Sequence, residues 1–166
     1  MPKRDPAQLK KVSLSLPFGI GKAEWESDPT ERRAAWSLYV ELVTRISVQK
    51  EALPDGSETE AIASLYSLFA VTRDILKSAG PDIGKTKGSV GAIALAVLNR
   101  GVRPFLTKWH SDLSHHHRDE EPASESGAVR NWPEREQFRD ELEIVQDGLA
   151  QYANALAAIA GVEGIE

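Results

Sequence analysis

The chain contains no cysteine among its 166 residues and only one methionine. Without cysteine it can form no disulfide, no thiolate metal site and no cysteine nucleophile, which agrees with a reducing compartment. It also lacks a basic excess, since 20 Lys and Arg stand against 25 Asp and Glu for a net charge of −5. Such a charge gives no general attraction to nucleic acid or to an anionic membrane. We therefore expect neither of these as a partner.

A membrane-spanning segment is also missing. The run without a polar side chain from Val90 to Leu98 is nine residues long, whereas a spanning helix needs about 20. No secretory leader is recognisable after the basic residues near the start of the chain. We therefore expect a protein of the cytoplasm, made of a single domain.

The same apolar run predicts the centre of the fold. A helix that is apolar on every side belongs in a protein interior, and the small residues of this one let neighbours approach closely. We expect this helix to extend over about 89–113. Pro104 lacks an amide hydrogen and its ring clashes with the carbonyl group of Arg100, which predicts a kink near 100–104.

Apolar residues recur at intervals of three and four in further segments, which predicts additional helices. Asp28 and Pro29 are typical of a helix start, and a helix follows over about 29–50. Ser57 begins an S-x-x-E capping box for another helix over about 57–79. A Pro-Asp-Gly turn signal separates the two.

The last expected helix, over about 132–160, has the most regular pattern. Its apolar residues step by four and three through three heptads, which is typical of long antiparallel bundles. With the other segments it predicts an all-α, four-helix up-down-up-down bundle over 29–161, followed by a short tail over 162–166. The residues of this apolar seam are Phe138, Leu142, Val145, Leu149, Tyr152, Leu156 and Ile159.

Residues 1–28 follow a period of two instead. Apolar residues alternate there with serine, proline and glycine, which predicts an extended N-terminal arm with one apolar face. Pro17 argues against a central strand. The arm either lies on the helices of its own chain or adds to the sheet edge of a partner. Its alternating residues are Val12, Leu14, Leu16, Phe18 and Ile20.

One pair of residues on the expected helix over 89–113 suggests an enzyme. Arg103 and His110 are seven residues apart and so share a helix face. An Arg-x6-His pair in a small helical bundle resembles the pattern of HEPN ribonucleases, although Pro104 stands where that family carries a polar residue. The resemblance implies metal-independent RNA cleavage at a dimer interface. His110 would act as acid and base, and Arg103 would stabilise phosphate charge with help from Asn99 or Arg100.

The same pair also has a structural interpretation. Arg103 would form an ion pair with a helix acid such as Glu41 or Asp74. His110 would lie near the end of its helix, where the helix dipole favours a cation. Under this interpretation neither residue takes part in chemistry.

Three consecutive histidines raise the question of a metal site. His115 and His117 could bind zinc or nickel through their imidazoles. Adjacent residues of one segment cannot all face one ion, and no second ligand pair with a regular spacing accompanies them. We therefore expect no metal and no other cofactor.

Since no catalytic arrangement outweighs its structural alternative, the sequence favours a non-enzymatic helical module for protein–protein interaction. It would serve as an adaptor, regulator or accessory subunit of a larger bacterial system, and the partner would be another protein or a second copy. Tryptophan residues are enriched at interfaces, and those of this chain join the apolar arm in the expected interaction surface. The expected interaction residues are Val12, Leu14, Leu16, Phe18, Ile20, Trp25, Trp36, Trp109 and Trp132.

Overall fold

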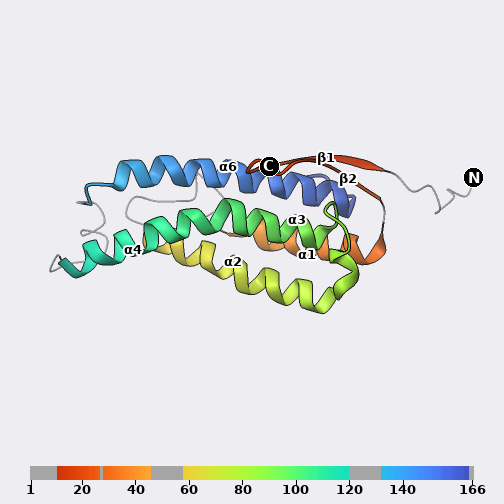
Figure 1. The fold of residues 1–166 in the computed structure, drawn as a ribbon, viewed down its shortest axis with the longest axis horizontal. Coiled ribbons are helices and arrows are strands. Elements are labelled where there is room, and N and C mark those ends of the chain that lie inside the picture. Colours follow the sequence, from red (N-terminus) through yellow and green to blue (C-terminus); the bar gives the residue numbers. More distant parts are fainter. Residues whose placement is uncertain (1–10, 27, 46–57, 120–131, 165–166) are drawn as a thin grey trace, which may run out of the picture.

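The computed structural model describes residues 11–26, 28–45, 58–119 and 132–164. Within these ranges the chain is mainly helical, as predicted, and carries one small antiparallel hairpin (Figure 1). The strands are β1 (Val12–Leu16) and β2 (Gly21–Trp25). The helices are α1 (Pro29–Val43), α2 (Glu58–Ala79), α3 (Val90–Ala96), α4 (Arg103–Asp119) and α6 (Arg135–Ala160), with a 3-10 turn η2 (Pro81–Gly84) and a π-helical segment η3 (Val97–Val102).

The helices lie along the long axis of the molecule (Figure 1). α1 packs against both α6 and α2, and α4 packs against α2 and α6. Glu58 at the start of α2 is fully buried and accepts hydrogen bonds from Arg135 Nε at 3.0 Å and Arg139 Nε at 2.7 Å. These bonds join the beginning of α2 to the beginning of α6. No described helix combines the length and the apolar character that crossing a bilayer requires.

The start of α1 agrees with the sequence pattern. The carboxylate of Asp28 accepts hydrogen bonds from the amides of Thr30 at 2.8 Å and Glu31 at 3.1 Å. α1 is described as a helix to Val43. The expected continuation to residue 50 and the capping box at Ser57 lie in a part of the chain outside the described residues.

The seam predicted on the last helix is confirmed as part of the core. All seven of its apolar residues are at most 5% exposed in α6. They face α1, the hairpin and the α3–η3–α4 run, with which α6 packs. α6 begins at Arg135, three residues later than expected, because the chain around Pro133 forms a turn before the helix.

The apolar run over 90–98 is buried on one side only, which corrects the expectation of a helix enclosed all round. Ile93 is 1% exposed and Val97 is fully buried, but Leu95 is 52% exposed. Leu95 lies two residues from each of them and so points to another side of the helix. Where a kink was expected, the structure has a π-helical segment, in which the amide of Arg103 donates to the carbonyl of Leu98.

The N-terminal segment is a hairpin rather than the single extended arm that was expected. β1 pairs with β2 in a register that sets Val12 opposite Trp25 and Leu16 opposite Gly21. The chain turns at Phe18, which has a φ of 58°, and at the following glycine. β1 packs on α6 of the same chain. The apolar face of the segment is thus covered internally.

Candidate binding groove

A groove of about 590 Å³ opens between α2 and the continuous α3–η3–α4 run. Its lining is mostly apolar, and Leu95 in it is half exposed. A volume of this size lies within the range of ligand-binding clefts. The apolar residues that line it are Phe69, Leu76, Pro81, Ile83, Leu95 and Leu98.

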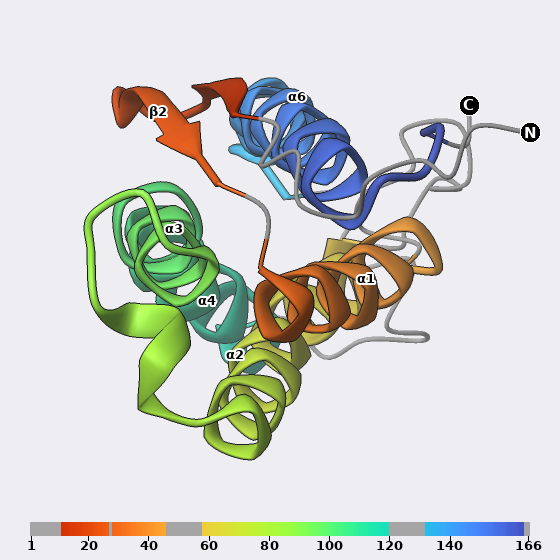
Figure 2. The same ribbon diagram turned by 90° about the vertical axis from the view of Figure 1, so that its right-hand side faces the viewer.

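The connection between α2 and α3 holds the groove open. Gly80 ends α2 with a φ of 88°, a conformation that favours glycine. η2 then packs directly on α3 at Gly91, where a Cβ atom would come within 2.7 Å of the Ile83 carbonyl oxygen. Figure 2 shows α2 and α3 standing apart at this end, with the lime-green η2 segment joining them. The groove therefore depends on a backbone approach that only glycine permits.

The rim of the groove is basic. Arg73 and Lys77 lie one turn apart on α2, and Arg103 lies opposite them at the start of α4. No aspartate or glutamate lines the groove. Within the described ranges neither Arg73 nor Lys77 has an ion-pair partner. The groove thus concentrates positive charge on a chain whose net charge is −5.

Arg103 is held in a defined position. Its Nε donates to Asn99 Oδ1 at 3.1 Å, and its guanidinium carbon lies 4.7 Å from the centre of the Phe69 ring. Asn99 lies in η3, and π-helical segments often accompany functional sites. The expected ion pair of Arg103 with Glu41 or Asp74 is not formed, since Arg103 contacts Asn99 and Phe69 instead.

The two residues that resemble the ribonuclease pattern are both exposed on α4. The structure brings Arg103 together with Asn99, as that pattern implies, but Arg103 extends toward the preceding turn. His110 lies seven residues further on, about 10 Å along the helix axis, and its ring contacts Tyr66 edge-on with 5.2 Å between the centres. Arg100 is exposed on η3.

Most of the expected interaction residues pack within the chain's own core. Of the nine, only Trp36 remains largely accessible, with 47% of its surface exposed and its ring stacked on Tyr39 at 5.9 Å. Trp109 packs edge-on against Trp132 at 5.4 Å and donates a hydrogen bond to Glu141. Buried residues are Leu14, Leu16, Trp25, Trp109 and Trp132, and partly buried ones are Val12, Phe18 and Ile20.

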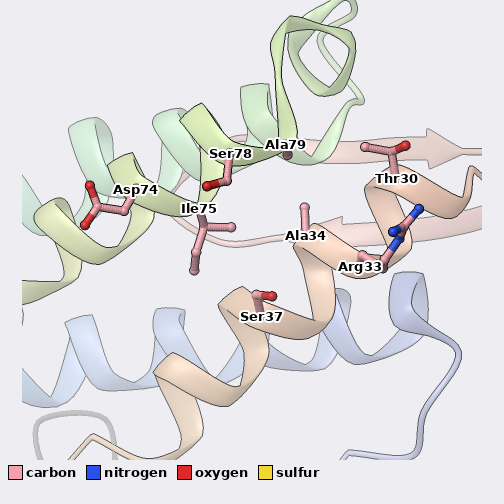
Figure 3. A pocket seen from close by; sticks show the side chains of 8 residues that line it. All are labelled: Thr30, Arg33, Ala34, Ser37, Asp74, Ile75, Ser78 and Ala79. Atoms are coloured by element: carbon pink, nitrogen blue, oxygen red, sulfur yellow. The ribbon is translucent and has the colours of Figure 1, made fainter.

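A second pocket, of about 480 Å³, lies between α1 and α2 (Figure 3). Small side chains such as Ala34 and Ser78 line its middle, and Arg33 and Asp74 lie at its opposite ends. The polar groups therefore do not converge on one point. This pocket offers less apolar surface than the groove and no cluster of like charge.

Metal ligands do not gather in the part of the chain that the structure describes, where no group of three or more histidine, aspartate and glutamate side chains could hold an ion. The side chains of His115 and His117 lie outside that part. The metal alternative therefore stays an expectation from the sequence.

Groups with a shifted pKa lie away from the groove. Burial raises the pKa of the Tyr152 hydroxyl far above its ordinary value. The hydrogen bond from Lys108 holds the pKa of Glu141 below its ordinary value, and Asp82 raises the pKa of Lys85. None of the three lines the groove.

Among the groove residues, the sequence patterns had not indicated Arg73, Lys77 or Leu95 as site residues. Comparison with known proteins adds no assignment, because no family model, no curated protein and no solved structure matches the chain.

Proposed function

We propose that the protein is a non-enzymatic helical interaction module, an adaptor, regulator or accessory subunit, whose groove between α2 and α3–η3–α4 holds a segment of a protein partner. The observation that carries this proposal is the combination of half-exposed Leu95 with a basic rim free of carboxylates. The partner is another protein or a second copy of the chain. In this proposal the protein acts in the cytoplasm of a bacterium.

The groove supplies what helix-in-groove recognition uses. Apolar side chains on both walls can receive the apolar face of a helix. Burying a leucine side chain completely contributes about 1.5–3 kcal/mol, so covering the exposed half of Leu95 contributes roughly half of that. Charges at the rim would set the orientation of the partner and its rate of association more than its affinity.

The walls must be stiff for such a site to be selective. We propose that the four helical segments act as an up-down-up-down bundle, so that α2 and the α3–η3–α4 run form adjacent antiparallel walls. The buried seam of α6 and the buried pairing of Glu58 with Arg135 and Arg139 support this arrangement.

Tagged protein expressed in its source cells would test the proposal. Leu95→Asp puts a charge into the groove, and Trp36→Asp puts one on the outer face of α1, at a side chain of similar exposure. The proposal expects a protein captured by the wild type and by Trp36→Asp but lost from Leu95→Asp. If capture survives Leu95→Asp but is lost in Trp36→Asp, the partner binds at α1. That result would overturn the proposal that the partner binds in the groove.

Metal-independent RNA cleavage is a second candidate, favoured by the contact between Arg103 and Asn99 on the helix that also exposes His110. Purified protein would be incubated with single-stranded RNA in the presence of EDTA. Cleavage that is lost in both Arg103→Ala and His110→Ala would support it. No cleavage by the wild type would exclude it.

A further inference from the structure

We infer that the groove receives the outer face of α6 from a second copy of the chain. This inference rests on the proposed function and names its partner. Ile144 of the partner subunit would lie against Leu95 in the groove. Acidic residues beside Ile144 would meet the basic rim, so that each copy contributes its groove to one neighbour and its α6 face to another.

The two most exposed large aliphatic side chains among the described residues carry the first part of the argument. Ile144 is 65% exposed and Leu95 is 52% exposed. Both belong to helices whose other apolar residues are largely buried, so neither is needed by its own core at that position. Each has apolar surface that a contact between copies would remove from water.

The charges around these two side chains are opposite in sign. Arg73, Lys77 and Arg103 surround Leu95, with no carboxylate in the lining. Glu136 and Asp140 precede Ile144 by eight and four residues on α6 and therefore share its helix face. Both are exposed. The two surfaces are therefore complementary in charge and in apolar character.

Each surface also contains a like-charge pair that the contact would relieve. Arg73 and Lys77 are four residues apart on α2, and Glu136 and Asp140 are four residues apart on α6. Like charges at this spacing destabilise a helix. A neighbour of opposite charge turns each repulsive pair into part of an attractive cluster.

Arg103 is prepared for a carboxylate. Asn99 accepts the hydrogen bond from its Nε, and the Phe69 ring lies beside its guanidinium group. The terminal N–H groups have no partner among the described residues. They can form the paired hydrogen bonds that arginine makes with a carboxylate.

The groove is long enough for the α6 face. Its α2 wall runs from Phe69 to Ala79, which is about 15 Å at the rise of an α-helix. The α6 face from Glu136 to Ile144 spans about 12 Å at the same rise. The backbone N–H and C=O groups of an α-helix are already hydrogen-bonded to one another. The α6 helix of a second copy therefore needs only side-chain contacts from the helical walls of the groove.

The contact would be head to tail. α6 lies at the top and α2 at the bottom of both Figure 1 and Figure 2, on opposite sides of the molecule. This arrangement favours a contact between the groove of one copy and the α6 face of the next over a mutual exchange of both contacts. Association of this kind continues into rings or open chains rather than stopping at a symmetric dimer.

Sedimentation velocity of the full chain at low salt, at concentrations from about 10 to about 500 µM that suit a weak association, would measure this self-association. The wild type should associate with rising concentration, and salt should weaken it. Arg73→Glu with Lys77→Glu, and separately Glu136→Lys with Asp140→Lys, should each reduce association at least about tenfold, since each variant has two surfaces of like sign. Circular dichroism would confirm that both variants remain folded.

Mixing the two variants gives the decisive result. The groove of each has the charge opposite to the α6 face of the other, so the mixture should associate although neither variant does alone. Lys22→Glu with Arg33→Glu makes the same charge change on exposed residues outside both surfaces and should associate like the wild type.

A wild type that stays monomeric throughout, or a mixture that fails to associate, would overturn the inference. Either result leaves the proposed function open to its own test, because Leu95→Asp can still abolish capture of a different protein. Anionic vesicles of phosphatidylglycerol serve as a further arm. Binding to them that depends on Arg73 and Lys77, without self-association, would assign the groove to lipid and also overturn the inference.

Discussion

The ring of Phe18 occupies the position that a Cβ atom on Gly148 would take. Phe18 lies in the turn of the hairpin, and Gly148 lies in the middle of α6. A Cβ atom on Gly101 in η3 would overlap the same ring. The turn of the hairpin is therefore held by the Phe18 ring, which lies between η3 and α6 at two glycines that leave room for it.

Replacing Gly148 by alanine should destabilise the protein, although alanine is the better helix former. Alanine favours a helix by about 1 kcal/mol over glycine, but overpacking costs typically about 1–3 kcal/mol. In a Phe18→Ala background the overlap is gone and the same substitution should stabilise. Urea denaturation of all four proteins measures this reversal of sign. An equal effect in both backgrounds would contradict the contact.

Glu31 connects the hairpin, α1 and α3. One carboxylate oxygen accepts from Trp25 Nε1 at 2.6 Å, and the other accepts from the Val90 amide at 2.9 Å. Ser89, which precedes α3, makes no side-chain hydrogen bond to cap that helix. Glu31 thus caps α3 from a distance of 59 residues in the sequence.

Glu31→Gln should lower the free energy of unfolding by about 1–3 kcal/mol, because the amide replaces one acceptor by a donor and leaves a donor unpaired. Thermal and urea denaturation measure this loss. Glu24→Gln on the exposed side of β2 makes the same chemical change and should have little effect. Equal stability of the two variants would rule out the bridging role.

Glu141 makes stability depend on pH. Lys108 Nζ donates to its carboxylate at 2.6 Å, and Trp109 donates to the other oxygen. The bond from Lys108, followed by those from Trp109 and Gln137, holds the pKa of Glu141 below its ordinary value of 4.5. A lowered pKa in the folded state contributes stability above the unfolded pKa, and this contribution is lost as pH falls through the folded pKa.

Glu141→Gln should therefore be less stable than the wild type at pH 7, and the difference should shrink as the pH falls below 4.5. Asp112→Asn, on an exposed carboxylate of α4, should show no such trend. Urea denaturation at pH 7, 5 and 3 measures both. A difference that stays constant over this range would show that the hydrogen bonds of Glu141 do not favour its charged form.

Local patterns predicted the helical part of the fold because the responsible interactions lie close together in the sequence. The carboxylate of Asp28 caps α1 two and three residues later, and the α6 seam is a matter of spacing on one helix. The hairpin was missed for a local reason as well. Its turn contains Pro17 and Gly19, which are typical turn residues, but the period of two that continues across them favoured a single extended segment.

The groove could not be predicted in the same way. Leu95 belongs to a run that is apolar on all sides, and only the separation of α2 from α3 by η2 decides which side stays exposed. The four-residue spacing of Arg73 and Lys77 is visible in the sequence. Their position beside Leu95 and Arg103 is a tertiary relationship, which composition and periodicity do not contain.

Site-specific photocross-linking in the source cells tests most directly whether the groove is the binding surface. A benzophenone side chain would replace Leu95 in one protein and Trp36 in another, since both positions are about half exposed. The account predicts a cross-linked protein from position 95, lost when Arg73 and Lys77 are changed to glutamate, and none from position 36. A cross-link from position 36 with none from position 95 would contradict it.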